Sequence, residues 1–503
     1  MPTVASADGP GTTLATHGNT LPSSSAANDS GPMTPKSLQL HPDRLFPVDA
    51  TTRDVARRLH ESVKDLPIIS PHSHVPPQWI ADDVNFRDPT SLLITPDHYV
   101  TRMMHANGVA LDDLGVGRGD LSEDDARRAF RHLCEHWADY NGTPVRYWLE
   151  NELVDIFGVD VRPGTETADH IYDAIAEWVA DPANSARQLM ERFDISVLAT
   201  TDDPCDSLEH HAALADDPTF TRRVVPTFRP DKYLEAAQPG WNALVDRLGE
   251  VSHHQVHDLP GFLAALQDRR AYFKAHGAVS TDHSHTDLGT QRLDEAEANR
   301  LYLAARTGTV SAAEGAALRR HLLWHQVRMA CEDGLTMTLH PAVSRNHHQP
   351  TFAKFGADVG ADIPISVEVT RALKPALDSF GTHPDLNLVL FTLDETVFSR
   401  EIAPLAGFYP TVYAGVPWWF LDAPDAIKRY RRAVTETAGF TRTSGFIDDT
   451  RAFCSIPARH DMSRRLDAVH LADLVVEHRL DEDEALETIN TLVVDNPRKV
   501  FKL

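Results

Sequence analysis

The sequence predicts an α/β fold, a closed (β/α)8 barrel, and two observations lead to it. Short runs of apolar or β-branched residues end in polar residues, as strands buried on both faces do. Stretches with helical periodicity separate these runs, as parallel crossovers require. Eight such runs occur, at residues 68–74, 197–202, 224–229, 278–283, 335–340, 388–394, 412–418 and 445–449.

The chain divides into a tail and a barrel. Residues 1–38 are rich in small and polar side chains, so they cannot bury enough surface to offset their ordering entropy, and we expect disorder there. A natural start at Met33 is a further hypothesis. We expect residues 39–503 to form the barrel, with its longest spacer, at about 80–190, a mainly helical insertion over the barrel mouth. The spacer Ala312–Asp333 is expected to form one long helix that ends at Gly334.

Composition excludes several kinds of partner. The net charge of −25 leaves no basic excess to bind nucleic acid or an anionic membrane. Four scattered cysteines without a CxxC pair suit a reducing compartment. No long apolar run and no signal-peptide pattern are present, so we expect a cytoplasmic protein. Association into a homo-oligomer is left open.

The first run ends in His72-Ser-His74. Alternation along an extended segment places both imidazoles on one side, where both can reach one metal ion. The motif alone is weak, because 27 histidines produce about one such triplet by chance, and His283-Ser-His285 is a second one. The first is favoured because it ends the first strand of a barrel. A purely hydrogen-bonding role is the alternative.

Two later runs end in side chains that complete this set. His340 follows the fifth run, and Asp449 closes the eighth. Active sites of such barrels lie at the carboxyl ends of the strands, so these groups should meet His72 and His74 around one mouth. Three histidines and a carboxylate suit one divalent transition ion, expected to be zinc. The alternatives are a satisfied core histidine for His340 and a structural cap or ion pair for Asp449.

Arginines and aromatic residues form a second group at the strand ends. Guanidinium groups bind carboxylates through paired hydrogen bonds, so arginines at the mouth of an acidic protein indicate an anionic substrate. Ion pairing with Asp202, Asp203 or Asp231 is the alternative. Aromatic rings stack on sugars, although buried aromatic residues are more often core. The candidate substrate-binding residues are Arg229, Arg345, Arg451, Trp418 and Trp419, with Tyr99 beside them.

From about residue 40 onward, the chain resembles the uronate isomerases, a branch of the amidohydrolase superfamily. Thr-Thr-Asp-Asp-Pro and Arg-Pro-Asp-Lys are the most specific of its matching segments. Residues 392–396 and 416–417 depart from the family pattern, which bears on substrate preference. The matching segments are Pro96-Asp-His-Tyr99, His105-Ala-Asn-Gly108, Thr200-Thr-Asp-Asp-Pro204, Asp206-Ser207, Phe228-Arg-Pro-Asp-Lys232, Thr281-Asp-His283, Leu339-His340, Arg345-Asn346, Trp418-Trp-Phe420 and Asp449-Thr-Arg451.

The resemblance implies interconversion of D-glucuronate with D-fructuronate, or of D-galacturonate with D-tagaturonate. One route removes the proton at C2 and passes through an enediol, which requires a base, an acid and stabilisation of the enediolate. We assign proton transfer to Asp449 or Tyr99 and polarisation of oxygen to His340 and the metal. Arg229 or Arg451 would hold the substrate carboxylate. The rivals are a mononuclear metal-dependent hydrolase and a sugar-acid-binding barrel without activity.

Overall fold

The computed structural model describes residues 36–503. The predicted disordered tail and Met33 lie outside the described residues, except for residues 36–38 at the tail's end. There, Leu38 is buried and its backbone N–H donates to Asp160 O at 2.7 Å, so the last residues of the predicted tail pack against the remainder of the chain.

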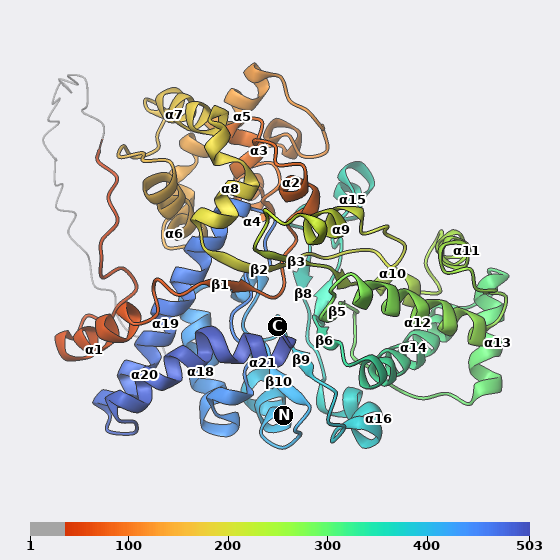
Figure 1. The fold of residues 1–503 in the computed structure, drawn as a ribbon. Helices are drawn as coiled ribbons and strands as arrows, with labels where there is room; N and C mark the ends of the chain where they lie inside the picture. Colours follow the sequence, from red (N-terminus) through yellow and green to blue (C-terminus); the bar gives the residue numbers. More distant parts are fainter. Residues whose placement is uncertain (1–35) are drawn as a thin grey trace, which may run out of the picture.

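Parallel strands form a ring at the centre of the molecule, with helices outside it (Figure 1). Two parallel sheets, β1-β2-β3 and β4-β5-β6-β9-β10, supply most of the ring, and a bridge between Asp202 and Phe228 joins them. The run predicted at 224–229 is split into β3 and β4 at Pro226, which has no N–H for the ladder. The strands of the ring are β1 (Ile68–Ser70), β2 (Ile195–Ala199), β3 (Arg223–Val225), β4 (Thr227–Phe228), β5 (Ser280–His283), β6 (Thr336–Leu339), β9 (Leu388–Leu390) and β10 (Val412–Ala414).

The predicted eighth strand, 445–449, is not a regular strand. Gly445 and Asp449 have positive φ angles of 76° and 45°, which an extended ladder does not tolerate. Single backbone hydrogen bonds still close the ring on both sides of this segment. Ser444 N donates to Ala414 O at 3.1 Å, and Asp449 N donates to His72 O at 3.2 Å. The prediction of a barrel is confirmed. The prediction that residues 445–449 form a regular strand is wrong.

The helices that follow the strands cover the outside of the ring. The predicted helix α14 spans Ala312–Asp333 and ends at Gly334, whose φ is 76°. After β6, a small antiparallel pair, β7 (Val343–Ser344) with β8 (Ile363–Pro364), reaches over the mouth. The helices after the second strand are α9 (Glu209–Asp216), α10 (Asp231–Leu234), α11 (Trp241–Ser252), α12 (Leu259–Ala275), α13 (Glu295–Arg306), α14, α15 (Gln349–Phe355), α16 (Thr370–Phe380), α17 (Ala403–Ala406), α18 (Pro424–Ala438) and α19 (Ile456–Val476).

Seven helices lie between β1 and β2 and gather at one side of the barrel, coloured orange to yellow in Figure 1. One of them, α4, starts at the pocket: Asp97 is its N-cap, and its side chain accepts a hydrogen bond from Tyr99 N. The helices are α2 (Pro77–Ala81), α3 (Pro89–Leu93), α4 (His98–Ala106), α5 (Glu123–Glu135), α6 (Pro144–Asn151), α7 (Ala168–Ala180) and α8 (Ala186–Arg192).

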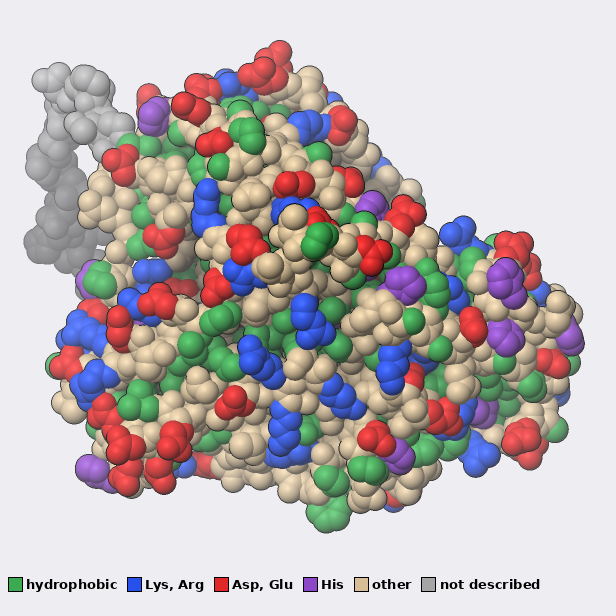
Figure 2. Space-filling view, in the orientation of Figure 1, with side chains coloured by type: hydrophobic (Ala, Val, Ile, Leu, Met, Phe, Trp, Pro, Cys, Tyr) green, Lys and Arg blue, Asp and Glu red, His purple; other side chains and the backbone are tan. Residues whose placement is uncertain are grey.

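Helices from both ends of the described chain pack on the barrel. α1 (Ala50–Glu61) packs its Val55 and Leu59 against α19 and α20 (Glu482–Asn490). The last helix, α21 (Asn496–Phe501), covers the amino ends of the strands, where Val500 O accepts hydrogen bonds from Thr336 and Asn387. The face in Figure 2 intersperses acidic side chains with lysine and arginine. Among residues 36–503, no helix has the length and hydropathy needed to cross a membrane.

Candidate active site

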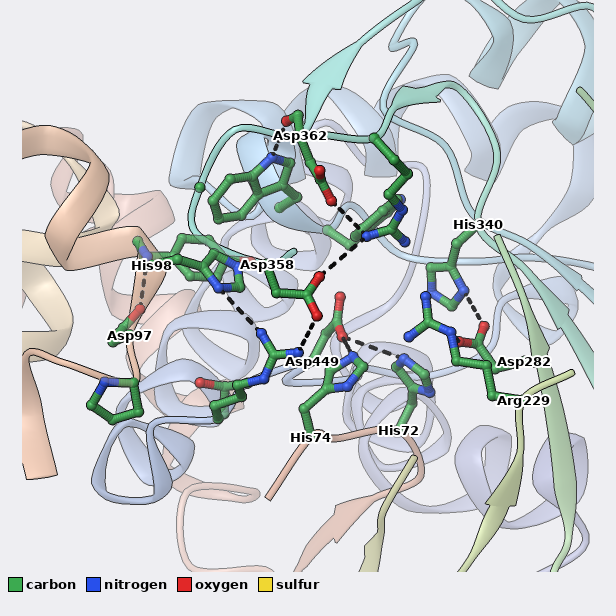
Figure 3. A pocket seen from close by; sticks show the side chains of 18 residues that line it. His72, His74, Asp97, His98, Arg229, Asp282, His340, Asp358, Asp362 and Asp449 are labelled. Carbon is green, nitrogen blue, oxygen red and sulfur yellow. Dashed lines mark hydrogen bonds and ion pairs between the residues drawn. The ribbon is translucent and has the colours of Figure 1, made fainter. Parts of the chain in front are cut away.

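A pocket of about 680 Å³, part of it open to solvent, lies at the carboxyl ends of the strands (Figure 3). The structure brings every candidate site residue of the sequence to this one pocket, although these residues are scattered over more than two thirds of the chain. The candidates that line it are His72, His74, Tyr99, Arg229, His340, Arg345, Trp418, Trp419, Asp449 and Arg451.

Two histidines from one strand end meet the carboxylate of another. The Nε2 atoms of His72 and His74 lie 3.3 and 2.8 Å from Oδ1 of Asp449. His74 N also donates to Thr450 O at 3.0 Å, which fixes the spacing of the two segments. Burial would raise the pKa of Asp449, but hydrogen bonds from both imidazoles hold it well below its usual range. Asp449 is therefore an ionised carboxylate at neutral pH.

This cluster fits a metal ion. The three ligand atoms lie within 4.8 Å of one another. Ligands about 2.0–2.2 Å from a shared ion lie roughly 3 Å apart, close to the spacings seen here. Imidazole nitrogen and carboxylate oxygen are donors that zinc and other divalent first-row ions accept. Both histidines contact Oδ1 of Asp449, so neither of these contacts occupies Oδ2.

His340 stands beside this cluster and is fixed by Asp282. Its Nδ1 lies 2.6 Å from Asp282 Oδ1, and its ring stacks on His72 with centroids 4.9 Å apart. Burial lowers the pKa of His340 despite that carboxylate, so the imidazole is neutral with its proton directed at Asp282. Among the described residues its Nε2 has no hydrogen-bond partner, which leaves that nitrogen available at the pocket.

Each of the three arginines is paired with at least one aspartate. Arg229 Nε lies 3.1 Å from Asp231 and 3.4 Å from Asp282, so the predicted alternative of pairing with Asp231 does occur. Arg345 pairs with Asp362 at 2.6 Å, and Arg451 pairs with Asp358 at 2.8 Å. The second carboxyl oxygen of Asp358 lies 3.8 Å from Arg345, so this aspartate lies between two arginines.

Aromatic side chains from the insertion and from the segment after β10 form one wall of the pocket. The Tyr99 ring packs edge-on against Trp419, with centroids 4.5 Å apart, and His98 packs against the same indole at 4.6 Å. Trp418 packs edge-on against His340 at 4.9 Å. Burial raises the pKa of the Tyr99 hydroxyl well above its usual value, so this group keeps its proton at neutral pH.

Sequence reasoning missed five acidic or imidazole groups of the pocket, namely Asp97, His98, Asp282, Asp358 and Asp362. Asp282 is the last residue but one of β5, so its place near a strand end was a usable signal. Asp358 and Asp362 lie in the excursion before β8, and no pattern in the sequence places that excursion over the mouth. His98 stands next to Tyr99 and could have been noticed with it.

A closed (β/α)8 barrel with ligand-type histidines at the end of its first strand, and a carboxylate at its last, is the architecture of the amidohydrolase class of enzymes. The sequence profile of the glucuronate isomerase family matches residues 49–501, and the chain belongs to this family. It is an enzyme of the isomerase class, and the hydrolase alternative is not favoured.

Individual relatives agree with this assignment. A uronate isomerase of Cutibacterium acnes is 60% identical over 94% of this chain and 100% of its own length. A uronate isomerase of Corynebacterium efficiens is 50% identical over 92% of this chain and 98% of its own. The crystal structure of glucuronate isomerase from Caulobacter crescentus superimposes with a TM-score of 0.91 at 42% identity, covering 93% of this chain and 98% of that one.

Proposed function

We propose that this site interconverts D-glucuronate with D-fructuronate, D-galacturonate with D-tagaturonate, or both, by proton transfer through an enediol. One observation carries the proposal: an ionised carboxylate, Asp449, lies with two imidazoles in a pocket that also holds three arginines. A base beside cationic groups suits a sugar that carries its own carboxylate.

Arg229 and Arg451 are our candidates for binding that carboxylate, with Arg345 as a further contact. Asp358 lies within reach of Arg451 and Arg345, so an arriving carboxylate would compete with it for the same guanidinium groups. Trp418 and Trp419 would pack against the apolar face of the sugar. This arrangement predicts that a neutral aldose binds poorly, because it offers the arginines no anion.

Asp449 is our candidate for the base at C2. It is ionised, and its Oδ2 is not used in the contacts with His72 and His74. Tyr99, which keeps its proton, is better suited to donating a hydrogen bond than to removing a proton. The two residues named together from the sequence thereby receive different roles.

His340 would exchange a hydrogen bond with the oxygen at C1 or C2 through Nε2, while Asp282 holds its opposite nitrogen. A divalent ion held by His72, His74 and Asp449 would supply positive charge near the oxygens on which the enediolate charge develops. We propose one such ion per active site, with zinc as the expected metal, because its donors are two imidazoles and a carboxylate.

Two further expectations belong to the same proposal. The four cysteines are buried and unpaired, which supports a reducing, cytoplasmic location. The partner is a small sugar acid rather than nucleic acid or a membrane, since the chain has a net charge of −25. Association into a homo-oligomer stays open.

The test is incubation of the purified protein with each uronate, followed by NMR, with metal content measured in parallel. Substrate deuterated at C2 should react more slowly and exchange its deuterium with water. Conversion without either effect would reject the enediol in favour of a hydride shift. An absence of conversion of both uronates by metal-loaded protein would reject the function.

A further inference from the structure

A second cluster of metal-ligand side chains lies behind the pocket wall, where β5 ends. Asp231, His283 and His285 each offer a ligand atom, and these atoms lie within 4.8 Å of one another. Both histidines are buried, with 1% and 4% of their surface exposed. Side chains alternate along a strand, so His283 faces away from the side on which its neighbour Asp282 contacts His340. The proposed isomerisation uses none of the three residues directly.

Each imidazole has one nitrogen held and the other free. His283 Nε2 lies 3.2 Å from Thr281 Oγ1, and His285 Nδ1 lies 2.9 Å from Glu235 Oε1. Within residues 36–503, neither the opposite nitrogen of His283, Nδ1, nor that of His285, Nε2, has a hydrogen-bond partner. Buried polar atoms without a partner are rare in folded proteins, and two of them in one cluster require an explanation.

The contacts around the cluster are those of a metal site. A histidine that binds a metal usually donates its other N–H to a carboxylate or hydroxyl group, as His285 is placed to do toward Glu235. Its free Nε2 lies 3.6 Å from Asp231 Oδ1, a spacing that two ligands of one ion can adopt. Asp231 also accepts hydrogen bonds from Ser284 N and Arg229, which favour its ionised form.

We propose that Asp231, His283 and His285 bind a second divalent transition ion, of the zinc class, distinct from an ion held by His72, His74 and Asp449. Water would complete its coordination shell. Such an ion would connect the start of α10, where Asp231 lies, to the end of β5. It would also fix Asp231, whose other oxygen is 3.1 Å from Arg229 in the pocket, so its role is positional rather than chemical.

The test counts zinc ions per chain in the full-length protein by mass spectrometry, after equilibration with zinc and removal of the excess. Two variants separate the two clusters. His72→Asn with His74→Asn removes both Nε2 atoms of the first cluster. His283→Gln with His285→Asn removes the two free nitrogens of the second, while leaving amide groups that can still reach Thr281 and Glu235.

We expect two ions in the unaltered protein and one in each double variant. His325→Asn is the control, because it removes a partly buried imidazole 3.2 Å from His321 that belongs to neither cluster, and it should leave two ions. The proposal would be overturned if the unaltered protein binds a single ion, and if this ion is lost when His72 and His74 are replaced or is retained when His283 and His285 are replaced. The first variant decides the matter even if the second does not fold. The experiment measures metal content, so its result does not depend on whether the protein catalyses the proposed isomerisation.

Discussion

The two His-Ser-His triplets of this chain have the same letters and different surroundings. His72 and His74 lie beyond the end of β1, in the segment that turns into the mouth, where both reach Asp449. His283 is the last residue of β5, and its side chain lies on the other side of the strand from the contacts of Asp282. Position relative to the strand end, rather than the motif, decides which triplet enters the pocket.

Arg229 connects the two regions. Its Nε lies 3.4 Å from Asp282, which holds His340 beside the first triplet, and 3.1 Å from Asp231 beside the second. One guanidinium is therefore positioned from both sides. We therefore expect catalysis at the first triplet and support of the pocket wall at the second, and the variants described below test this difference.

The largest effect is expected for Asp449→Asn. The amide keeps the shape of the side chain and removes the negative charge, so the proposed base is lost. We expect kcat to fall by about 10³-fold or more, the upper part of the range for general-base groups. Steady-state assays with each uronate test this, and circular dichroism checks the fold. Activity within a few-fold of the unaltered protein would remove Asp449 from the chemistry.

A smaller effect is expected for Arg229→Lys. Lysine keeps the charge but cannot form the two parallel hydrogen bonds of a guanidinium with a carboxylate. We expect KM to rise about 10- to 100-fold, corresponding to about 1.4–2.8 kcal/mol, with a lesser change in kcat. Steady-state kinetics separate the two constants. An unchanged KM with a reduced kcat would instead place Arg229 at the reacting carbons.

His285→Asn should change turnover less than either substitution above. The residue acts on the pocket only through Asp231 and Arg229, so we expect kcat/KM to fall by no more than about 10-fold, mostly through KM. The matched first-triplet variant, His74→Asn, should lose far more and mostly in kcat. Equal losses in the two variants would contradict the division between chemistry and support.

The last effect is on stability rather than on turnover and concerns Asp202, the neighbour of Thr201, whose hydroxyl donates to Ser73 O of the first triplet at 2.9 Å. Burial raises the pKa of Asp202 to about 7. Between its ordinary value of about 3.9 and 7 the folded state binds more protons than the unfolded state, so this group's contribution to stability falls as pH rises. Asp202→Asn should flatten that fall, by at most about 1.4 kcal/mol per unit of pKa shift.

Urea unfolding of both proteins at pH 5 and pH 8 measures this difference. The unaltered protein should lose more stability between the two pH values than the Asp202→Asn variant does. The same loss in both would show that Asp202 is ionised in the folded protein throughout this range.

The parts of the site that lie at strand ends were predictable. His340 and Arg229 could be placed because the carboxyl ends of parallel strands share one mouth, so sequence position along a strand implies position in space. Tyr99 was named with the aromatic candidates and again through the family resemblance, but nothing in local periodicity brings the start of α4 to the pocket.

The remainder depends on geometry that a linear pattern does not carry. Asp358 reaches Arg451 only because β7 and β8 pair and carry the intervening segment over the mouth. The sequence places Asp282 near the end of a strand. Which face of the sheet its side chain lies on depends on how the side chains alternate along β5. The irregular segment before Asp449 has an apolar run like a strand, and its positive φ angles override that pattern.

That irregular segment also links folding to chemistry. The ring closes where residues 444–450 meet the end of the first strand, through the bonds from Asp449 N to His72 O and from His74 N to Thr450 O. With no continuous ladder, this joint has few hydrogen bonds to break, so amide hydrogen exchange should be faster there than in β5 or β6. The barrel's weakest joint and its reactive centre are then the same place, and any opening of the ring disassembles the site first.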